Sequence, residues 1–163
     1  MRYLMTFSYD GSDFYGYQKQ NNERTVQGEI EKVLTKINSN NKVLISASGR
    51  TDRGVHAINQ KAHFDMEIND IDKLLNSLNK LVPTDIYNKK IEKVSDDFHA
   101  RFNVLKKEYI YKINMGEYNP LMRNYIYQYN DKLDIQKMIE ASKYFIGTHN
   151  FKSFTKCLKE YEE

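Results

Sequence analysis

Residues 42–66, KVLISASGRTDRGVHAINQKAHFDM, decide the fold, because two strand-like segments flank a polar loop. The first segment, residues 42–48, is apolar and β-branched and predicts a strand. The second, residues 60–66, predicts another strand. The residues between them therefore form a loop held by two strands, and functional residues are commonly displayed on such loops.

This loop gathers an unusual set of side chains. Residues 47–57, ASGRTDRGVHA, carry one carboxylate, two guanidinium groups, an imidazole, two hydroxyls and two glycines. Arg50 and Arg53 flank Asp52, and nearby opposite charges favour the ionised form of a carboxylate. An ionised Asp can act as a nucleophile or a base. The alternative is an ordinary turn, in which Asp52 makes an Asx-type hydrogen bond and the glycines supply positive φ angles.

The chain before and after this stretch predicts further elements. A strand is indicated by apolar side chains at every second position, and two helices by apolar side chains on one helical face. The strand members are Tyr3, Met5, Phe7 and Tyr9; the first helix follows a Thr25 N-cap with Val26, Ile30, Val33, Leu34 and Ile37; the second follows Asn69 or Asp70 with Ile71, Leu74, Leu75, Leu78 and Leu81. Val82-Pro83 ends the second helix, and residues 86–94 predict the last strand.

The predicted order is β-α-β-β-α-β, which defines an α+β fold of the ferredoxin-like or RRM-like kind. Two helices are expected on one face of an antiparallel sheet, and the opposite face is expected to remain open to a ligand, as in RNA-binding modules of similar topology. We assign residues 1–97 to this N-terminal domain, which carries the loop with Asp52.

Residues 98–163 predict the start of a second, incomplete α/β domain. Residues 107–115 and 125–129 are strand-like, and a helix carrying Ile135, Met138, Ile139, Phe145 and Ile146 is expected to close at Gly147. Tyr109 and Tyr111 are two positions apart on the first of these strands and would face the same side. Aromatic faces on a sheet stack nucleic-acid bases, at about 1–3 kcal/mol each.

Charge is informative through its distribution. The net charge is only +3, but residues 42–61 contain the cations Lys42, Arg50, Arg53 and Lys61 and a single acid, Asp52. Such a local basic field suits phosphate groups. For Lys42 and Lys61 the simpler interpretation is a solvated strand edge whose lysines discourage aggregation.

Composition excludes several classes of protein. The chain has no stretch near the ~20 apolar residues of a membrane span and no signal peptide, and its single cysteine, Cys157, fits a reducing compartment. The four histidines, His56, His63, His99 and His149, have no metal-ligand spacing. We therefore expect a cytoplasmic protein with no metal, no cofactor and no membrane partner.

Residues 49–56 match all defined positions of G-R-T-D-x-G-V-H, the signature of the tRNA pseudouridine synthase A family, and the chain resembles that family from about residue 1 to 154. Arg53 stands where family members often have a small residue. Further matches follow in the family's order: Tyr9-Asp10-Gly11-Ser12, Phe14-Tyr15-Gly16-Tyr17-Gln18, Thr25-Val26-Gln27, Asp96-Asp97-Phe98-His99-Ala100-Arg101-Phe102, Tyr109 and Tyr111.

The resemblance implies an isomerase that converts uridine to pseudouridine in the anticodon stem-loop of tRNA, without cofactor, as a homodimer. It gives Asp52 the catalytic role, sets Tyr109 against the target uracil and implicates Arg50 in base flipping. Arg53, Arg101 and His56 are candidate RNA contacts, and His56 is also expected to brace the loop. Family members are longer, so we expect this chain to match their first two thirds and to be inactive by itself.

Two other functional classes stay open at this point. A noncatalytic RNA-binding module, or an inactive fragment of such an enzyme, would use the same fold and basic loop, but would not need the intact residues 49–52. A metal-dependent hydrolase would pair Asp52 with Asp65 or Asp97, although their spacing suggests no shared coordination shell.

Overall fold

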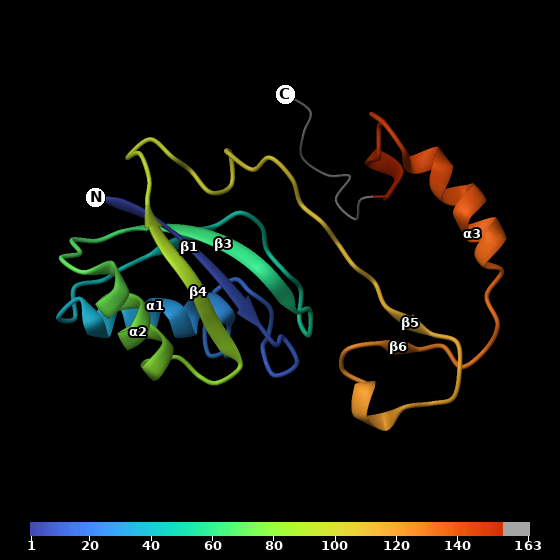
Figure 1. The fold of residues 1–163 in the computed structure, drawn as a ribbon, viewed down its shortest axis with the longest axis horizontal. Helices are drawn as coiled ribbons and strands as arrows, with labels where there is room; N and C mark the ends of the chain where they lie inside the picture. Colours follow the sequence, from blue (N-terminus) through green and yellow to red (C-terminus); the bar gives the residue numbers. More distant parts are fainter. Residues whose placement is uncertain (155–163) are drawn as a thin grey trace. The chain divides into compact units, whose positions relative to one another are not determined.

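The computed structural model describes residues 1–154 of the chain. These residues fall into two compact units, Met1–Ile110 and a second that begins at Tyr111, and Figure 1 shows the elements of each. Cys157 lies outside the described residues. Within the described part of the chain, no helix is both long and apolar enough to cross a membrane.

The first unit has the predicted β-α-β-β-α-β order. Its elements are β1 (Arg2–Tyr9), α1 (Val26–Ile37), β2 (Ile45–Ala47), β3 (Ala57–Asp65), α2 (Ile71–Leu81) and β4 (Ile86–Lys93). The strands form a four-stranded sheet in the order β2-β3-β1-β4, and every neighbouring pair is antiparallel. The ferredoxin-like α+β fold is therefore confirmed.

The core lies between this sheet and the two helices. Alternate side chains of β1, including Met5 and Phe7, are fully buried, because successive residues of a strand point to opposite faces. Tyr3 stacks on Phe64 of the neighbouring strand with ring centroids 6.0 Å apart. The helices contribute the apolar faces expected from the sequence, namely Val26, Ile30, Val33 and Leu34 from α1 and Leu74 and Leu78 from α2.

Both helix starts carry the expected side-chain caps. Thr25 Oγ1 accepts a hydrogen bond from the Gly28 amide at 3.3 Å, and Asp70 Oδ1 accepts one from Lys73 at 2.9 Å. Of the two residues proposed to cap the second helix, Asp70 is thus the cap. A cap satisfies one of the backbone donors that the first turn leaves without an intrahelical partner.

The face of the sheet opposite the helices is partly covered, which corrects the expectation of an open face. His63 on β3 is only 6% exposed, and its Nδ1 accepts a hydrogen bond from the Ala100 amide at 3.1 Å. Arg2 on β1 forms two bonds to Asp65, of 2.8 and 2.9 Å, and donates to the Phe98 carbonyl at 2.9 Å. These contacts hold residues 98–100 on this face, because a guanidinium can bind a carboxylate and a carbonyl together.

The His63 contact predicts a pH-dependent stability. Burial lowers the pKa of His63 below its ordinary 6.5, and the charges of Arg2 and His99 lower it further. Between that lowered pKa and 6.5, the unfolded chain therefore binds more protons than the folded chain. The free energy of unfolding should therefore rise with pH across this window. Histidine C2–H titration by NMR and urea unfolding at several pH values measure both quantities. His63→Asn should flatten the slope, and an equal slope in both proteins would contradict the assignment.

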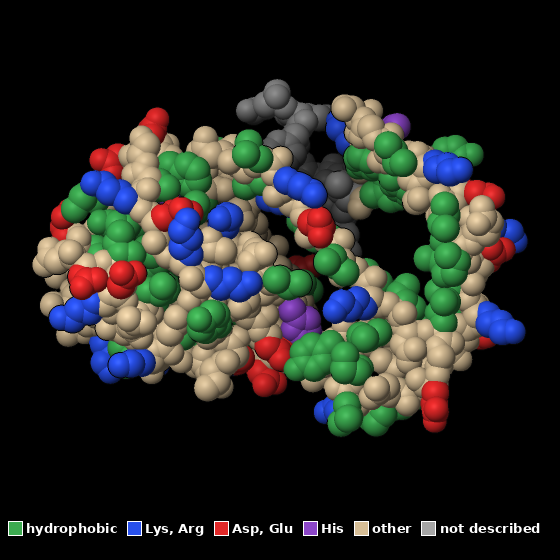
Figure 2. Space-filling model, in the orientation of Figure 1, with side chains coloured by type: hydrophobic (Ala, Val, Ile, Leu, Met, Phe, Trp, Pro, Cys, Tyr) green, Lys and Arg blue, Asp and Glu red, His purple; other side chains and the backbone are tan. Residues whose placement is uncertain are grey.

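The second unit is less regular than predicted. It contains β5 (Ile113–Asn114) paired in parallel with β6 (Tyr127–Gln128), and α3 (Ile135–Ser142), with short 3-10 helices at Pro120–Met122, Lys143–Phe145 and Lys152–Phe154. The helix expected to run to Gly147 ends at Ser142 and continues as a 3-10 turn. None of residues 111–154 is buried, and Figure 2 shows hydrophobic side chains on the surface of this unit.

The strand predicted for residues 107–115 is wrong for most of its length. Only Ile113–Asn114 pair with another strand, and Tyr109 lies in extended chain outside any strand, with its side chain 81% exposed. A strand needs a neighbour to receive its backbone hydrogen bonds, and alternating side chains alone do not supply one. The prediction that Tyr109 and Tyr111 face the same side of one strand is therefore also wrong.

Candidate active site

Asp52 lies at the tip of the loop that joins β2 to β3. The Val55 amide donates to the Asp52 carbonyl at 3.2 Å, which closes a turn over residues 52–55. Gly54 completes the turn with φ +77°, a conformation that other L-residues adopt with strain. The Asp52 side chain is exposed, so the turn presents the carboxylate to solvent.

The two arginines beside Asp52 do not neutralise it. Arg50 is exposed, and the Arg53 guanidinium lies over the Tyr15 ring, 4.2 Å from its centroid. Among the described residues, neither arginine forms an ion pair with Asp52. Ion pairs between exposed groups contribute little in water, whereas stacking on an aromatic ring gives Arg53 a defined position.

The base of the loop is held by Gln60 on β3. Its Nε2 donates to the Gly49 carbonyl at 2.9 Å, and its Oε1 lies 2.8 Å from Ser48 Oγ. The Ser48 amide also donates to the Lys61 carbonyl at 2.8 Å, which extends the strand pairing to the first residue of the loop. Gln60 is buried, so these bonds are shielded from competing water.

Thr51, immediately before Asp52, is bound through both its side chain and its backbone. The Tyr9 hydroxyl lies 2.8 Å from Thr51 Oγ1, and the Tyr17 amide donates to the Thr51 carbonyl at 3.0 Å. Tyr9 ends β1, and Tyr17 lies in the loop of residues 10–24 that follows it. The backbone that leads into Asp52 is therefore fixed from a neighbouring segment.

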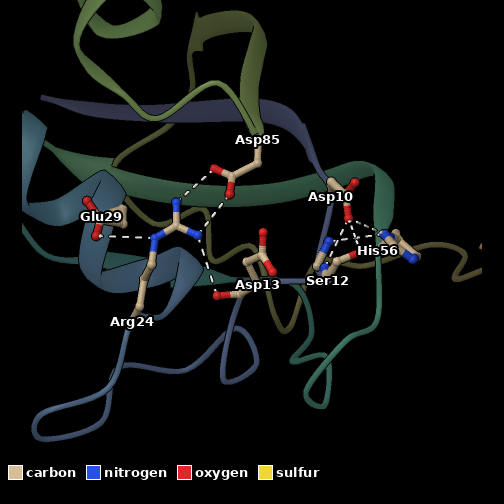
Figure 3. Close-up of polar contacts among 8 residues, drawn as sticks. Asp10, Ser12, Asp13, Arg24, Glu29, His56 and Asp85 are labelled. Carbon is tan, nitrogen blue, oxygen red and sulfur yellow. Dashed lines mark hydrogen bonds and ion pairs between the residues drawn. The ribbon is translucent and has the colours of Figure 1, made fainter. Parts of the chain in front are cut away.

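His56, at the other end of the loop, contacts the same neighbouring segment (Figure 3). Its Nδ1 lies 3.0 Å from both the Gly11 amide nitrogen and Asp10 Oδ1. Asp10 Oδ1 also accepts from the Ser12 amide at 3.0 Å and from Ser12 Oγ at 2.6 Å. A neutral ring accepts from Gly11, and a protonated ring pairs with Asp10, so either state joins residues 10–12 to the loop of Asp52.

The loop of residues 10–24 is itself anchored to the start of β4. Figure 3 shows the Arg24 guanidinium between Asp85 and Glu29, with bonds of 2.8 and 3.0 Å to the Asp85 carboxylate. The guanidinium also lies 4.0 Å from the centre of the Phe14 ring. A bidentate, stacked arginine of this kind fixes geometry more firmly than a single ion pair.

Two further predicted residues lie on the segment after β4. The Arg101 amide donates to His99 Nδ1 at 3.2 Å, while its side chain is exposed near the Phe102 ring. Tyr109 is exposed in extended chain. Within the described part of the chain, no hydrogen bond or ion pair joins Arg101 or Tyr109 to Asp52.

The local sequence pattern does not indicate Tyr9, Gln60 and Tyr17 as partners of the loop. Tyr9 looks like one more core residue of an alternating strand, and Gln60 like one more strand residue. Their contacts join residues up to 42 positions apart in the chain. The only local signal was a polar side chain at a position that the sheet buries.

The described residues contain no cluster of three or more His, Cys, Asp or Glu side chains able to hold a metal ion.

Comparison with known proteins identifies the family of this chain. A family model described as tRNA pseudouridine synthase matches residues 5–103. Relatives named tRNA pseudouridine synthase A are 49% identical over 161 residues in Listeria monocytogenes serotype 4b, 47% over 156 in Streptococcus agalactiae serotype Ia and 43% over 163 in Anoxybacillus flavithermus. These alignments cover 98%, 94% and 99% of this chain, but 65%, 60% and 66% of the relatives. The chain therefore belongs to the tRNA pseudouridine synthase family and spans about two thirds of the length of these relatives.

Proposed function

We propose that this chain carries the catalytic loop of a tRNA pseudouridine synthase, which isomerises uridine in the anticodon stem-loop of tRNA. The observation that carries the proposal is the loop of residues 48–56, which combines the family signature with an exposed Asp52 on a backbone fixed at both ends. The protein is proposed to act as a homodimer in the cytoplasm, without metal or cofactor. Residues 1–97 are proposed as its N-terminal domain and residues 98–163 as the beginning of a second domain.

The reaction explains why one carboxylate can suffice. The bond between uracil N1 and ribose C1′ breaks, the uracil rotates, and C5 bonds to C1′ as C5 loses its hydrogen and N1 gains one. No redox change or external energy is needed. Asp52 is proposed to attack the ring, attack the sugar or remove the C2′ proton; all three roles need an ionised carboxylate that reaches the nucleotide.

The other site residues are proposed to prepare the nucleotide. A uridine must leave the helical stack before it can reach Asp52, which costs a few kcal/mol. Arg50 is proposed to fill the space of the flipped base, and Tyr109 to stack on the uracil. Arg53, Arg101 and His56 are proposed RNA contacts, and the stacking of Arg53 on Tyr15 supports this role because it gives the guanidinium a defined position.

The reaction can be measured through the hydrogen that leaves C5. The full-length protein encoded by the gene is incubated with tRNA transcribed from uridine tritiated at C5, and released tritium is counted. We expect release from tRNA that has uridines in the anticodon stem-loop, and none when these uridines are replaced by cytidine. Tight tRNA binding without tritium release would favour the noncatalytic RNA-binding module instead.

Binding of tRNA is expected to weaken steeply as salt rises, because each phosphate neutralised by Lys or Arg releases counterions. Figure 2 shows Lys and Arg side chains on the surface of the first unit. If three phosphates are contacted, affinity should fall about 40-fold between about 50 and 200 mM salt. Fluorescence anisotropy with labelled tRNA measures this slope.

Arg53→Ala should reduce the slope of this plot by about one, whereas Lys73→Ala on α2, outside the loop, should leave it unchanged. A flat profile for the unmodified protein would argue against a nucleic-acid partner.

A further inference from the structure

Four side chains form a polar group beneath the loop of Asp52, which we call the Tyr9 network: the buried Tyr9 and Gln60 and the half-buried Ser48 and Thr51. Tyr9 is only 4% exposed, and its hydroxyl lies 2.8 Å from Thr51 Oγ1 and near the Gln60 side chain. Gln60 in turn bonds Ser48 Oγ and the Gly49 carbonyl. The network thus forms hydrogen bonds with Gly49 and Thr51, the residues on either side of Arg50, and Thr51 directly precedes Asp52.

The position of Asp52 depends on the backbone that the network holds, because no hydrogen bond or ion pair of the described residues holds the Asp52 side chain itself. Asp52 is exposed, and the structure gives its carboxylate no hydrogen bond or ion pair among residues 1–154. Its direction is therefore set by the backbone of Thr51, which is held at Oγ1 by Tyr9 and at its carbonyl by the Tyr17 amide. Release of Thr51 Oγ1 removes one of these two restraints.

Tyr17 supplies an internal comparison. Its ring lies 6.4 Å from the Tyr9 ring in the same core and is 2% exposed, but its hydroxyl has no hydrogen-bond partner among residues 1–154. The Tyr17 ring therefore packs in the core without a hydrogen bond from its hydroxyl. The Tyr9 hydroxyl, in contrast, contacts Thr51 in the loop of Asp52, so the two hydroxyls separate a packing role from a positioning role.

We propose that the Tyr9 network is a positioning device that fixes the direction in which Asp52 and Arg50 leave the loop, with the Tyr9–Thr51 hydroxyl pair as its critical bond. The inference rests on the proposed function, which makes Asp52 the catalytic residue. A displacement of about 1 Å can cost up to a hundredfold in rate when a reacting group must be aligned. Tyr9 and Thr51 act through Asp52 and do not themselves touch the substrate.

Four single substitutions in the full-length protein test this positioning. Tyr9→Phe and Thr51→Val, which preserve shape, should each lower kcat for tritium release about tenfold and leave KM within about twofold. Thr51→Ser, which restores a hydroxyl, should recover most of kcat. Tyr17→Phe is the matched control and should match the unmodified protein. The double variant Tyr9→Phe/Thr51→Val should lose no more than either single variant, because both remove the same bond.

A second readout keeps the inference independent of catalysis. Backbone amide NMR shifts of residues 50–54 should move in Tyr9→Phe and stay in place in Tyr17→Phe. If the unmodified protein releases no tritium, the proposed function fails, and the amide shifts alone decide the positioning. Turnover by Tyr9→Phe at the unmodified rate, a loss confined to KM, or unchanged amide shifts would each overturn the inference.

Discussion

Asp52→Asn should abolish pseudouridine formation, lowering kcat at least about a thousandfold, because the amide can neither take up a proton as the carboxylate does nor act as an anionic nucleophile. Its affinity for tRNA should stay within about tenfold, or about 1.4 kcal/mol, of the unmodified protein. Asp52 is exposed and its carboxylate makes no hydrogen bond or ion pair among the described residues, so the substitution should leave the structure intact. Tritium release and anisotropy on the full-length protein measure the two effects separately.

The control for this substitution is Asp72→Asn on the first turn of α2, which removes the same charge away from the loop. It should retain full turnover. Substantial turnover by Asp52→Asn would remove Asp52 as the catalytic residue. A loss of tRNA binding as large as the loss of rate would show that Asp52 contributes to binding and not to the chemical step.

Gly11→Ala should destabilise the first unit by about 2–3 kcal/mol, in the range of overpacking substitutions. A Cβ at this position would lie 2.1 Å from the Val55 carbonyl oxygen and 2.6 Å from the Val55 carbonyl carbon. Both atoms belong to the backbone of the loop that carries Asp52, so the chain has to move apart there. The rate of tritium release should also fall at least tenfold, since the loop of Asp52 is displaced from its contact with residues 10–12.

Gly49→Ala is the matched control for stability. Among the described residues, a Cβ at Gly49 would meet only the far end of the flexible Lys107 side chain, with Nζ at 3.4 Å and Cε at 3.7 Å. The free energy of unfolding should therefore change by less than about 0.5 kcal/mol, as for most substitutions without a buried consequence. Urea unfolding followed by circular dichroism compares the two variants. Equal stability of Gly11→Ala and Gly49→Ala would mean that the close approach of the two loops is not maintained in solution.

The first unit shows how far local patterns reach. Alternating apolar residues in β1, the apolar helix faces and the Thr25 cap predicted the element order, and the structure confirms them. These signals are local, because burial of one face needs a period of two in a strand and of about 3.6 in a helix. The start of β2 was less well predicted, since residues 42–48 were expected to be a strand and only Ile45–Ala47 pair.

The predictions that failed concern partners. Residues 107–115 have a strand-like pattern, but only Ile113–Asn114 find a strand to pair with. Arg50 and Arg53 were expected to hold Asp52 ionised from nearby, but Arg53 stacks on Tyr15 and neither arginine forms an ion pair with Asp52 among the described residues. The open sheet face was expected to be bare, but residues 98–100 cover His63. In each case the pattern described a side chain correctly and said nothing about what the side chain would meet.

The sequence by itself determined the β-α-β-β-α-β order, the family and the loop that carries Asp52, because each is encoded in adjacent residues. Only the tertiary structure decided how that loop is held. Tyr9 and Thr51 are 42 positions apart, and Gly11 and His56 are 45 apart, yet their bonds fix the backbone around Asp52. Such contacts depend on the register of β1 against β3 and on the path of residues 10–24, which are set by the packing of the whole unit.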